Sequence, residues 1–222
     1  MNATVLALVA SAVFLVRLLP QPIRLARTGS VSGVSALAAL TSVLTTTGWL
    51  AYGLWAGLPV VWAVSVVALI PGIWTVVLLR RETTRLDVAA AGSWLGVQVV
   101  AAVVGLFAAV LAAGVLVTQG PQVVKSIRES DLSGIAPATW WISVLDAATW
   151  GAYGVAIGDA ALMGYGVVLM VSAAIVLSRV YWTRRHRSVG ADSARGSADG
   201  GAQHLADGGG DGHGQATEQQ HA

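Results

Sequence analysis

Long apolar stretches separated by short polar segments run through most of this chain. Residues 28–79 contain no charged side chain, and residues 88–124 contain none either. A run of about twenty apolar residues is long enough to cross the hydrocarbon core of a bilayer as a helix. The pattern therefore predicts an all-α membrane protein with seven transmembrane helices. The expected helices cover residues 3–19 with a kinked continuation to 27, then 35–55, 60–79, 84–103, 105–126, 138–157 and 160–181.

The apolar stretch from Val88 to Val117 has to be divided between two helices. As one helix it would be about 45 Å long, against about 30 Å of hydrocarbon. If the later helix continues through Pro121, it covers residues 105–126 and leaves residues 84–103 for a complete helix before it. This division gives seven spans.

Basic residues favour seven spans over six. With seven spans, the loops near Gly57, Val104 and Gly158 hold no Lys or Arg, and the basic residues share the opposite side. Cytoplasmic loops carry the basic excess of membrane proteins. We therefore expect a plasma-membrane protein with its N-terminus outside and its C-terminus in the cytoplasm. The residues on the basic side are Arg17, Arg24, Arg27, Arg80, Arg81, Arg85, Lys125, Arg128, Arg179, Arg184, Arg185 and Arg187.

Composition excludes several classes of protein. Charged residues make up 11% of the chain, against about 25% in soluble domains. The sequence holds no cysteine, which excludes disulfides and thiolate sites. A net charge of +2 gives no reason to expect a nucleic-acid partner. The lipid bilayer is the partner that this composition predicts.

One segment of the chain occurs twice, at an offset of 101 residues. Pro20-Gln21 of the first copy corresponds to Pro121-Gln122 of the second, and Trp49-x-x-Tyr52-Gly53 corresponds to Trp150-x-x-Tyr153-Gly154. Apolar bulk alone would not align Pro, Gln, Trp, Tyr and Gly without a gap. We interpret the two segments as an internal duplication, in which each copy contributes three helices.

The paired Pro-Gln and Trp-x-x-Tyr-Gly motifs resemble the PQ-loop superfamily and, within it, the SWEET (MtN3/saliva) sugar transporters. The resemblance implies two parallel three-helix bundles joined by a linker helix, in a 3+1+3 arrangement. The corresponding boundaries are 3–82 for the first repeat, 83–104 for the linker helix and 105–182 for the second repeat. From Ser188 the composition is polar and small, so residues 183–222 are expected to form a disordered cytoplasmic tail.

The resemblance also implies roles for individual residues. Pro20 and Pro121 match the hinge prolines of the family, and Tyr52 and Asp159 match the pair that closes its outer gate. We group Gln21 and Gln122 with these hinge prolines, and two roles stay open for them: capping of backbone groups freed at the proline kink, or binding of solute.

The substrate-binding residues that the resemblance implies are Trp49 and Trp150, together with the positions where the family carries asparagine. Those positions hold Ser65 and Gly166 here, so this chain lacks the pocket amides. Tryptophan also serves at membrane interfaces and in helix packing, and we expect that role for the other tryptophans. These are Trp55, Trp62, Trp74, Trp140, Trp141 and Trp182.

Asp146 stands near the middle of the sixth expected span, where the first repeat has Thr45. A carboxylate at this depth costs about 3 kcal/mol even on insertion scales. We count it among the substrate-binding residues, as a proton-coupling or polar-solute site. The alternative is a helix–helix hydrogen bond to a serine, a threonine or Gln98.

No catalytic site is expected. The expected spans hold no His, Cys or Lys, and the histidines of the tail lack the spacing of metal ligands. We therefore predict no enzyme activity, no metal and no cofactor.

The expected function is alternating-access transport of a small polar solute such as a mono- or disaccharide, with facilitative sugar transport of the SWEET type first. Two alternatives stay open. One is a proton-coupled carrier of an amino acid or similar metabolite using Asp146, and the other is a non-transporting scaffold or receptor. The solute and the oligomeric state, including a homo-oligomer, are not determined by the sequence.

Overall fold

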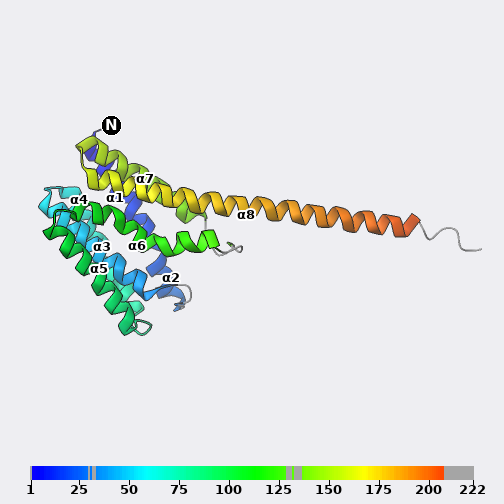
Figure 1. Cartoon of the computed structure of the whole chain (residues 1–222), viewed down its shortest axis with the longest axis horizontal. Helices are drawn as coiled ribbons and strands as arrows, with labels where there is room; N and C mark the ends of the chain where they lie inside the picture. Colours follow the sequence, from blue (N-terminus) through cyan, green and yellow to red (C-terminus); the bar gives the residue numbers. More distant parts are fainter. Residues whose placement is uncertain (1, 30, 32–33, 129–131, 133–136, 208–222) are drawn as a thin grey trace, which may run out of the picture. The chain divides into compact units, whose positions relative to one another are not determined.

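The computed structural model describes residues 2–29, 31, 34–128, 132 and 137–207, and all the secondary structure in them is helical (Figure 1). The all-α prediction is therefore confirmed. The helices are α1 (Ala3–Leu18), α2 (Pro20–Thr28), α3 (Ala36–Trp55), α4 (Pro59–Leu78), α5 (Arg85–Val103), α6 (Phe107–Arg128), α7 (Pro137–Ile157) and α8 (Ala160–Asp207).

The two proline positions of the repeat have different local structures. In the first repeat, α1 ends at Leu18 and α2 begins at Pro20, with Leu19 between them still helical (φ −70°, ψ −37°). Proline fits the first position of a helix because its missing N–H needs no partner there. In the second repeat, α6 continues through Pro121 to Arg128 as one helix. Both copies thus carry the chain past the proline in helical conformation, as the sequence predicted.

Five helical segments are long and apolar enough to cross a membrane. They are Ala3–Thr28, Ala36–Trp55, Pro59–Leu78, Arg85–Val103 and Ala160–Thr183. Helix α6 has a shorter apolar part, Phe107–Gly120. Helix α7 has 21 residues but is not among these segments. The chain is accordingly an integral membrane protein with several apolar helices.

Helix α4 packs against α3, α1 and α2. In the second half, one apolar cluster joins α8 to α7 and α6, through Val176, Trp140 and Val123 among others. The third helix of each half thus contacts the first and second helices. The halves meet where α1 packs on α7 and where α3 packs on α6, and α5 lies against α3 and α6.

The turns after α3 and α7 have matching geometry. Gly57 (φ 67°) and Gly158 (φ 72°) end the two helices in the left-handed conformation, which glycine adopts without steric cost. The next backbone N–H reaches back to Gly53 O in one copy and to Gly154 O in the other, at 2.8 Å in both. The same hydrogen bonds at an offset of 101 residues support the internal duplication.

Residues 181–222 form a unit of their own, separate from residues 1–180. Helix α8 continues into this unit as far as Asp207, where the composition from Ser188 had predicted disorder. An existing helix extends one residue at a time without a new nucleation step, which allows a segment of small and polar residues to remain helical. Residues 208–222, also part of the predicted tail, lie outside the described residues.

Tryptophans divide into exposed and buried groups. Trp55, Trp62, Trp74, Trp141 and Trp182 have exposed rings, as expected for side chains that face lipid or the interface. Trp140 was expected in that group, but it is only 3% exposed and belongs to the cluster between α6, α7 and α8. Its neighbour Trp141 faces outward instead, because adjacent residues of a helix lie about 100° apart.

Candidate functional site: a cavity between the two repeats

A cavity of about 630 Å³ lies among the helices of residues 1–180. Both repeats line it, since Trp49 and Ser65 come from the first copy and Trp150 and Tyr165 from the second. Its wall combines aromatic rings with many side-chain hydroxyl groups. The hydroxyl residues are Ser35, Thr41, Ser42, Thr45, Thr46, Ser65, Thr75, Thr118, Thr139, Ser143 and Tyr165.

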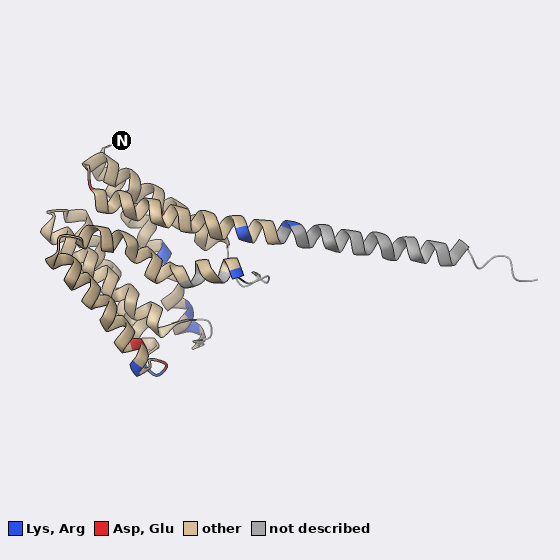
Figure 2. Cartoon of the chain, in the orientation of Figure 1, with Lys and Arg blue, Asp and Glu red and all other residues tan. Residues whose placement is uncertain are grey.

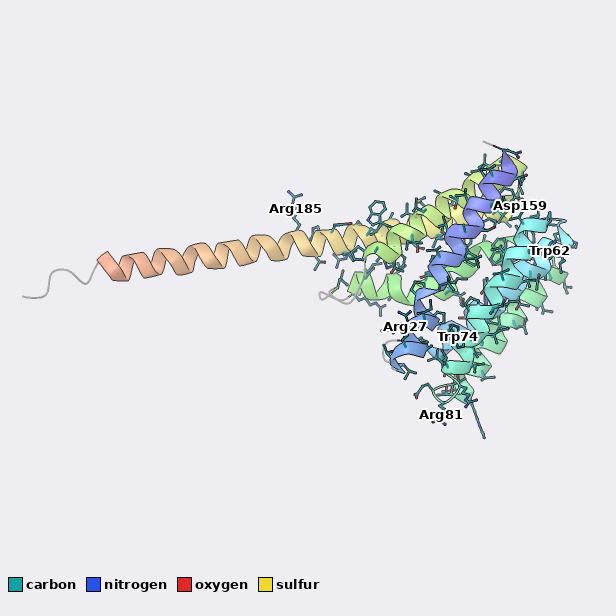
Figure 3. All side chains as sticks on the ribbon, turned by 180° about the vertical axis from the view of Figure 1, so that it is seen from behind. Arg27, Trp62, Trp74, Arg81, Asp159 and Arg185 are labelled. Carbon is teal, nitrogen blue, oxygen red and sulfur yellow. The ribbon has the colours of Figure 1, made fainter. Side chains whose placement is uncertain are left out.

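The cavity runs along much of the length of the helices, from Val61 and Leu162 near one end to residues near the other end. Its lining includes Ser35 at the start of α3, Thr75 near the end of α4 and Thr139 at the start of α7. These are the helix ends that lie next to most of the arginines. Figure 2 shows the basic segments of this unit gathered mainly at the end away from the N-terminus, and Figure 3 places Arg27 and Arg81 there.

At the other end of the helices, away from these arginines, a polar contact joins the two halves. The Tyr52 hydroxyl donates a 2.7 Å hydrogen bond to Asp159 Oδ2. The other oxygen, Asp159 Oδ1, accepts from Leu162 N at 2.9 Å and so caps the start of α8. Trp49 and Phe107 pack edge-on against the Tyr52 ring, with centroids 5.7 and 6.3 Å away. Figure 3 places Asp159 at the end of the bundle away from Arg27 and Arg81.

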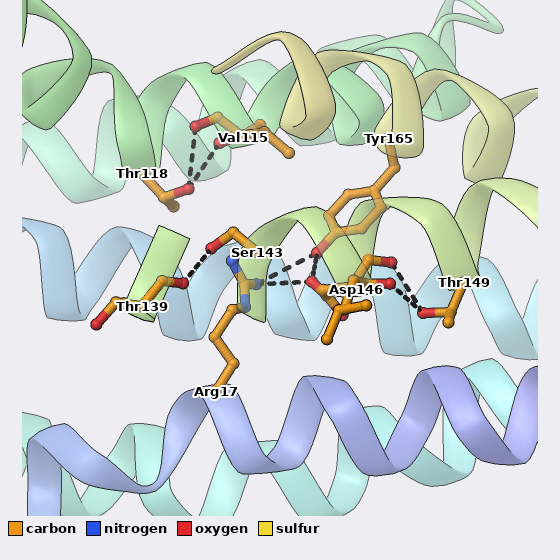
Figure 4. A network of polar contacts seen from close by, with 10 residues as sticks. Arg17, Val115, Thr118, Thr139, Ser143, Asp146, Thr149 and Tyr165 are labelled. Atoms are coloured by element: carbon orange, nitrogen blue, oxygen red, sulfur yellow. Dashed lines mark hydrogen bonds and ion pairs between the residues drawn. The ribbon is translucent and has the colours of Figure 1, made fainter. Parts of the chain in front are cut away.

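A buried polar cluster joins three helices beside the cavity: Arg17 of α1, Asp146 of α7 and Tyr165 of α8 (Figure 4). Arg17 Nη2 lies 3.3 Å from Asp146 Oδ2 and donates to the Tyr165 hydroxyl oxygen at 3.2 Å. The Tyr165 hydroxyl in turn donates to Asp146 Oδ2 at 2.7 Å. The three groups thus form a closed triangle that connects the first helix of one repeat to two helices of the other.

The cluster is buried to different depths. The Asp146 side chain has no exposed surface, whereas the Arg17 side chain is 13% exposed and lines the cavity. Within the described residues, Arg17 Nε and Asp146 Oδ1 are buried without a hydrogen-bond partner. Removal of one member of a buried ion pair leaves the other charge uncompensated, at a cost of about 3–5 kcal/mol. Arg17 and Asp146 therefore depend on each other.

The structure places the predicted substrate-binding residues in three settings. Trp49, Trp150 and Ser65 line the cavity, although the Ser65 hydroxyl already donates to Val61 O at 2.7 Å. Asp146 lies behind the wall formed by Arg17 and Tyr165. Gly166 is away from the cavity wall, because it lies where α8 crosses the backbone of α7. The expected substrate role of Gly166 has no support in this placement.

The predicted hinge residues are less fully described. Gln21 lines the cavity and Pro20 is exposed at the α1–α2 junction. The side chains of Pro121 and Gln122 lie outside the described part of the structure. Whether these four residues act as hinges stays a prediction.

Sequence reasoning missed Arg17 and Tyr165. Arg17 was counted only as a basic residue on the cytoplasmic side, and the expected partners of Asp146 were serine, threonine or Gln98. One signal was available: at an offset of 101 residues Arg17 corresponds to Thr118, Asp146 to Thr45 and Tyr165 to Val64. At all three positions the two copies of the repeat carry different kinds of residue. Opposite charges in membrane helices also tend to pair.

The position of Asp146 has a neutral counterpart in the first repeat. Thr45 accepts a 2.9 Å hydrogen bond from Trp94 Nε1 of helix α5. Helix α5 thus provides a polar partner for Thr45, whereas Arg17 of α1 provides one for Asp146. This difference makes the two halves chemically unequal at matching depths.

Among the described residues, no group of three or more His, Cys, Asp or Glu side chains is arranged to hold a metal ion. Comparison with known proteins adds no assignment, since no protein-family model and no curated protein matches this chain.

Proposed function

We propose that this protein carries small polar solutes across the membrane by alternating access, with facilitative movement of a sugar as the first candidate. The observation that carries the proposal is a cavity lined by both repeats, with a Tyr52–Asp159 hydrogen bond joining the halves at one end of the helices. Transporters built from repeats bind their solute at the interface between the halves. A wall of aromatic rings and hydroxyls suits a solute that has both an apolar face and polar groups.

The proposed topology has seven spans in a 3+1+3 arrangement, with α1–α2, α3 and α4 in one bundle and α6, α7 and α8 in the other. Helices α6 and α7 are not among the five candidate spans, and the proposal places both in the membrane. Helix α7 is long enough to cross it, since its 21 residues correspond to about 32 Å. With the basic ends in the cytoplasm, the cavity faces inward and the Tyr52–Asp159 contact closes the outside. The N-terminus is then outside the cell and the C-terminus inside, and the chain belongs to the PQ-loop superfamily with a SWEET-like arrangement.

The absence of cysteine from the sequence makes the sidedness directly testable. A single cysteine at Arg81 and one at Gly158, each in its own variant, can be labelled in intact cells and in inverted vesicles with a membrane-impermeant maleimide. The proposal expects Arg81 to react only from the cytoplasmic side and Gly158 only from outside. Labelling of both positions from the same side contradicts the topology.

Transport is tested with purified protein in liposomes. Labelled monosaccharides and disaccharides should equilibrate across the membrane faster than in protein-free liposomes, and unlabelled sugar inside should accelerate the entry of labelled sugar. A variant lacking residues 188–222 should retain this activity. If no solute moves and removal of these residues abolishes binding of a partner, the scaffold alternative is favoured.

A second candidate is a proton-coupled carrier of an amino acid or similar metabolite. The observation that favours it is the fully buried carboxylate of Asp146 beside the cavity, because such groups in membranes often serve proton transfer. Uptake would then rise when a pH gradient is imposed, and Asp146→Asn would abolish the response to the gradient. A rate that is equal with and without the gradient rejects this candidate.

A further inference from the structure

We infer that Arg17 is a solute-binding residue of the cavity and that its pairing with Asp146 makes the cavity select uncharged solutes over organic anions. The inference rests on the proposed carrier function. It assigns a residue and a mechanism of charge selection that neither the repeat motifs nor the resemblance contains. In this arrangement Asp146 and Tyr165 are positioning residues, because they act on the solute through Arg17.

Arg17 is the only charged residue among those described that line the cavity. A guanidinium has five N–H donors in a rigid plane, and only Nη2 has hydrogen-bond or ion-pair partners in the buried triangle. The side chain is held further by Phe14, since the Arg17 Cζ lies 5.5 Å from the centroid of the Phe14 ring. A held guanidinium can donate to oxygen atoms of a solute without reordering itself.

This donor takes the place of the missing pocket amides. Ser65 donates its hydroxyl to its own helix, and Gly166 offers no side chain. Several other hydroxyls of the wall are also engaged with their own helices; Ser143 Oγ, for example, donates to Thr139 O at 3.1 Å. The guanidinium of Arg17 is therefore a strong donor in a wall whose hydroxyls are largely satisfied.

The charge of Arg17 is compensated inside the protein. Besides Arg17 of α1, the ionisable group that faces Asp146 among the described residues is Tyr165 of α8, and its hydroxyl donates to the same carboxylate oxygen. An anion entering the cavity thus meets an ion pair with no net charge, yet loses its own hydration. If it draws Arg17 away, it leaves the Asp146 carboxylate buried and uncompensated. A hydroxyl-bearing solute meets neither penalty, so the cavity favours it.

The decisive experiment removes the Asp146 charge that compensates Arg17 and measures the preference for neutral over acidic solutes. Purified protein is tested for ligand-induced thermal stabilisation with three matched pairs that differ by one carboxylate: glucose and glucuronate, galactose and galacturonate, glycerol and glycerate. The wild-type protein should prefer the neutral member of the pair that it binds. Asp146→Asn leaves Arg17 charged and uncompensated, so the preference should move toward the acid by at least about tenfold.

A matched control is available in Asp87→Asn. Asp87 lies in the first turn of α5, where it forms a capping box with Thr84, and it is not among the residues that line the cavity. The same chemical change there should leave the ratio of neutral to acid affinity as in the wild type. A similar shift in both variants overturns the inference, because it would reflect net charge alone.

A second variant tests the role of Arg17 even if Asp146→Asn does not fold. The double variant Arg17→Thr/Asp146→Thr places at both positions the residue found in the other repeat, so no buried charge is left alone. It should bind the neutral solute at least about tenfold more weakly without gaining affinity for the acid. Wild-type affinity in the double variant overturns the role of Arg17.

The two proposals fail in different ways. If the wild-type protein binds a neutral solute but Asp146→Asn keeps the same preference, charge selection by the pair is wrong and the carrier function stands. A wild-type preference for the acid likewise overturns the inference alone. If the wild-type protein stabilises with no member of any pair and moves none of them in liposomes, both proposals fall.

Discussion

Gly166 offers a sharp test of how the second repeat packs. A Cβ added at this position would lie 2.7 Å from Gly151 Cα, 2.8 Å from Ala147 O and 3.0 Å from Gly151 N. All three atoms belong to the backbone of α7 and cannot rotate away, so Gly166→Ala must push α7 and α8 apart. Overpacking of this kind costs about 1–3 kcal/mol.

The cost is partly offset, because alanine favours a helix over glycine by about 1 kcal/mol. We therefore expect Gly166→Ala to lower the free energy of unfolding by about 1–2 kcal/mol. This loss corresponds to a fall in melting temperature of about 2–8 °C for a chain of this size. Gly151→Ala is the matched control on the facing helix. Its Cβ would meet only Gly166 Cα, at 3.6 Å, which is an ordinary contact. This variant should therefore melt at or above the wild-type temperature.

The assay is thermal unfolding of the purified protein in detergent, followed by tryptophan fluorescence. Both variants make the same substitution at the same helix crossing, so differences in helix propensity cancel between them. Equal melting temperatures for the two variants would refute the argument, because they would mean that α7 and α8 do not approach as closely as the structure has them.

Two further predictions concern the closed end and the α6–α7–α8 cluster. Tyr52→Phe removes the 2.7 Å hydrogen bond to Asp159 and should shift the equilibrium toward an outward-open form by about 1 kcal/mol, or roughly fivefold. A single cysteine in the cavity should then react faster with an impermeant reagent added from outside. An unchanged reaction rate would contradict the gate proposed at Tyr52 and Asp159. Trp140→Ala should lower stability by about 3 kcal/mol because its ring is 3% exposed, whereas Trp141→Ala, with 51% exposure, should change stability little. Equal losses in thermal unfolding would show that the orientation of α7 is wrong.

The local pattern of the sequence was enough to place the helices. Charge-free stretches and the turns between them predicted the bounds of α3, α4, α5 and α7 to within one residue at either end, and the kink at Pro20 appears as the α1–α2 junction. This works because the length and apolarity of a membrane helix are imposed by the bilayer, residue by residue. The offset of 101 residues also anticipated the matching turns at Gly57 and Gly158, since both depend on nearby backbone hydrogen bonds.

Side-chain partners were decided by the tertiary structure. Neither spacing nor periodicity indicates that Arg17 of α1 reaches Asp146, because the contact depends on how α1 packs against the opposite repeat. The same packing buries Trp140 and exposes Trp141, and it places Gly166, a predicted pocket residue, where α8 crosses α7. In a membrane the helices form first from local sequence, whereas their association depends on close contact between surfaces far apart in the chain. The sequence alone thus determined most of the helices and the repeated motifs, while the chemistry of the cavity arose only where the two halves meet.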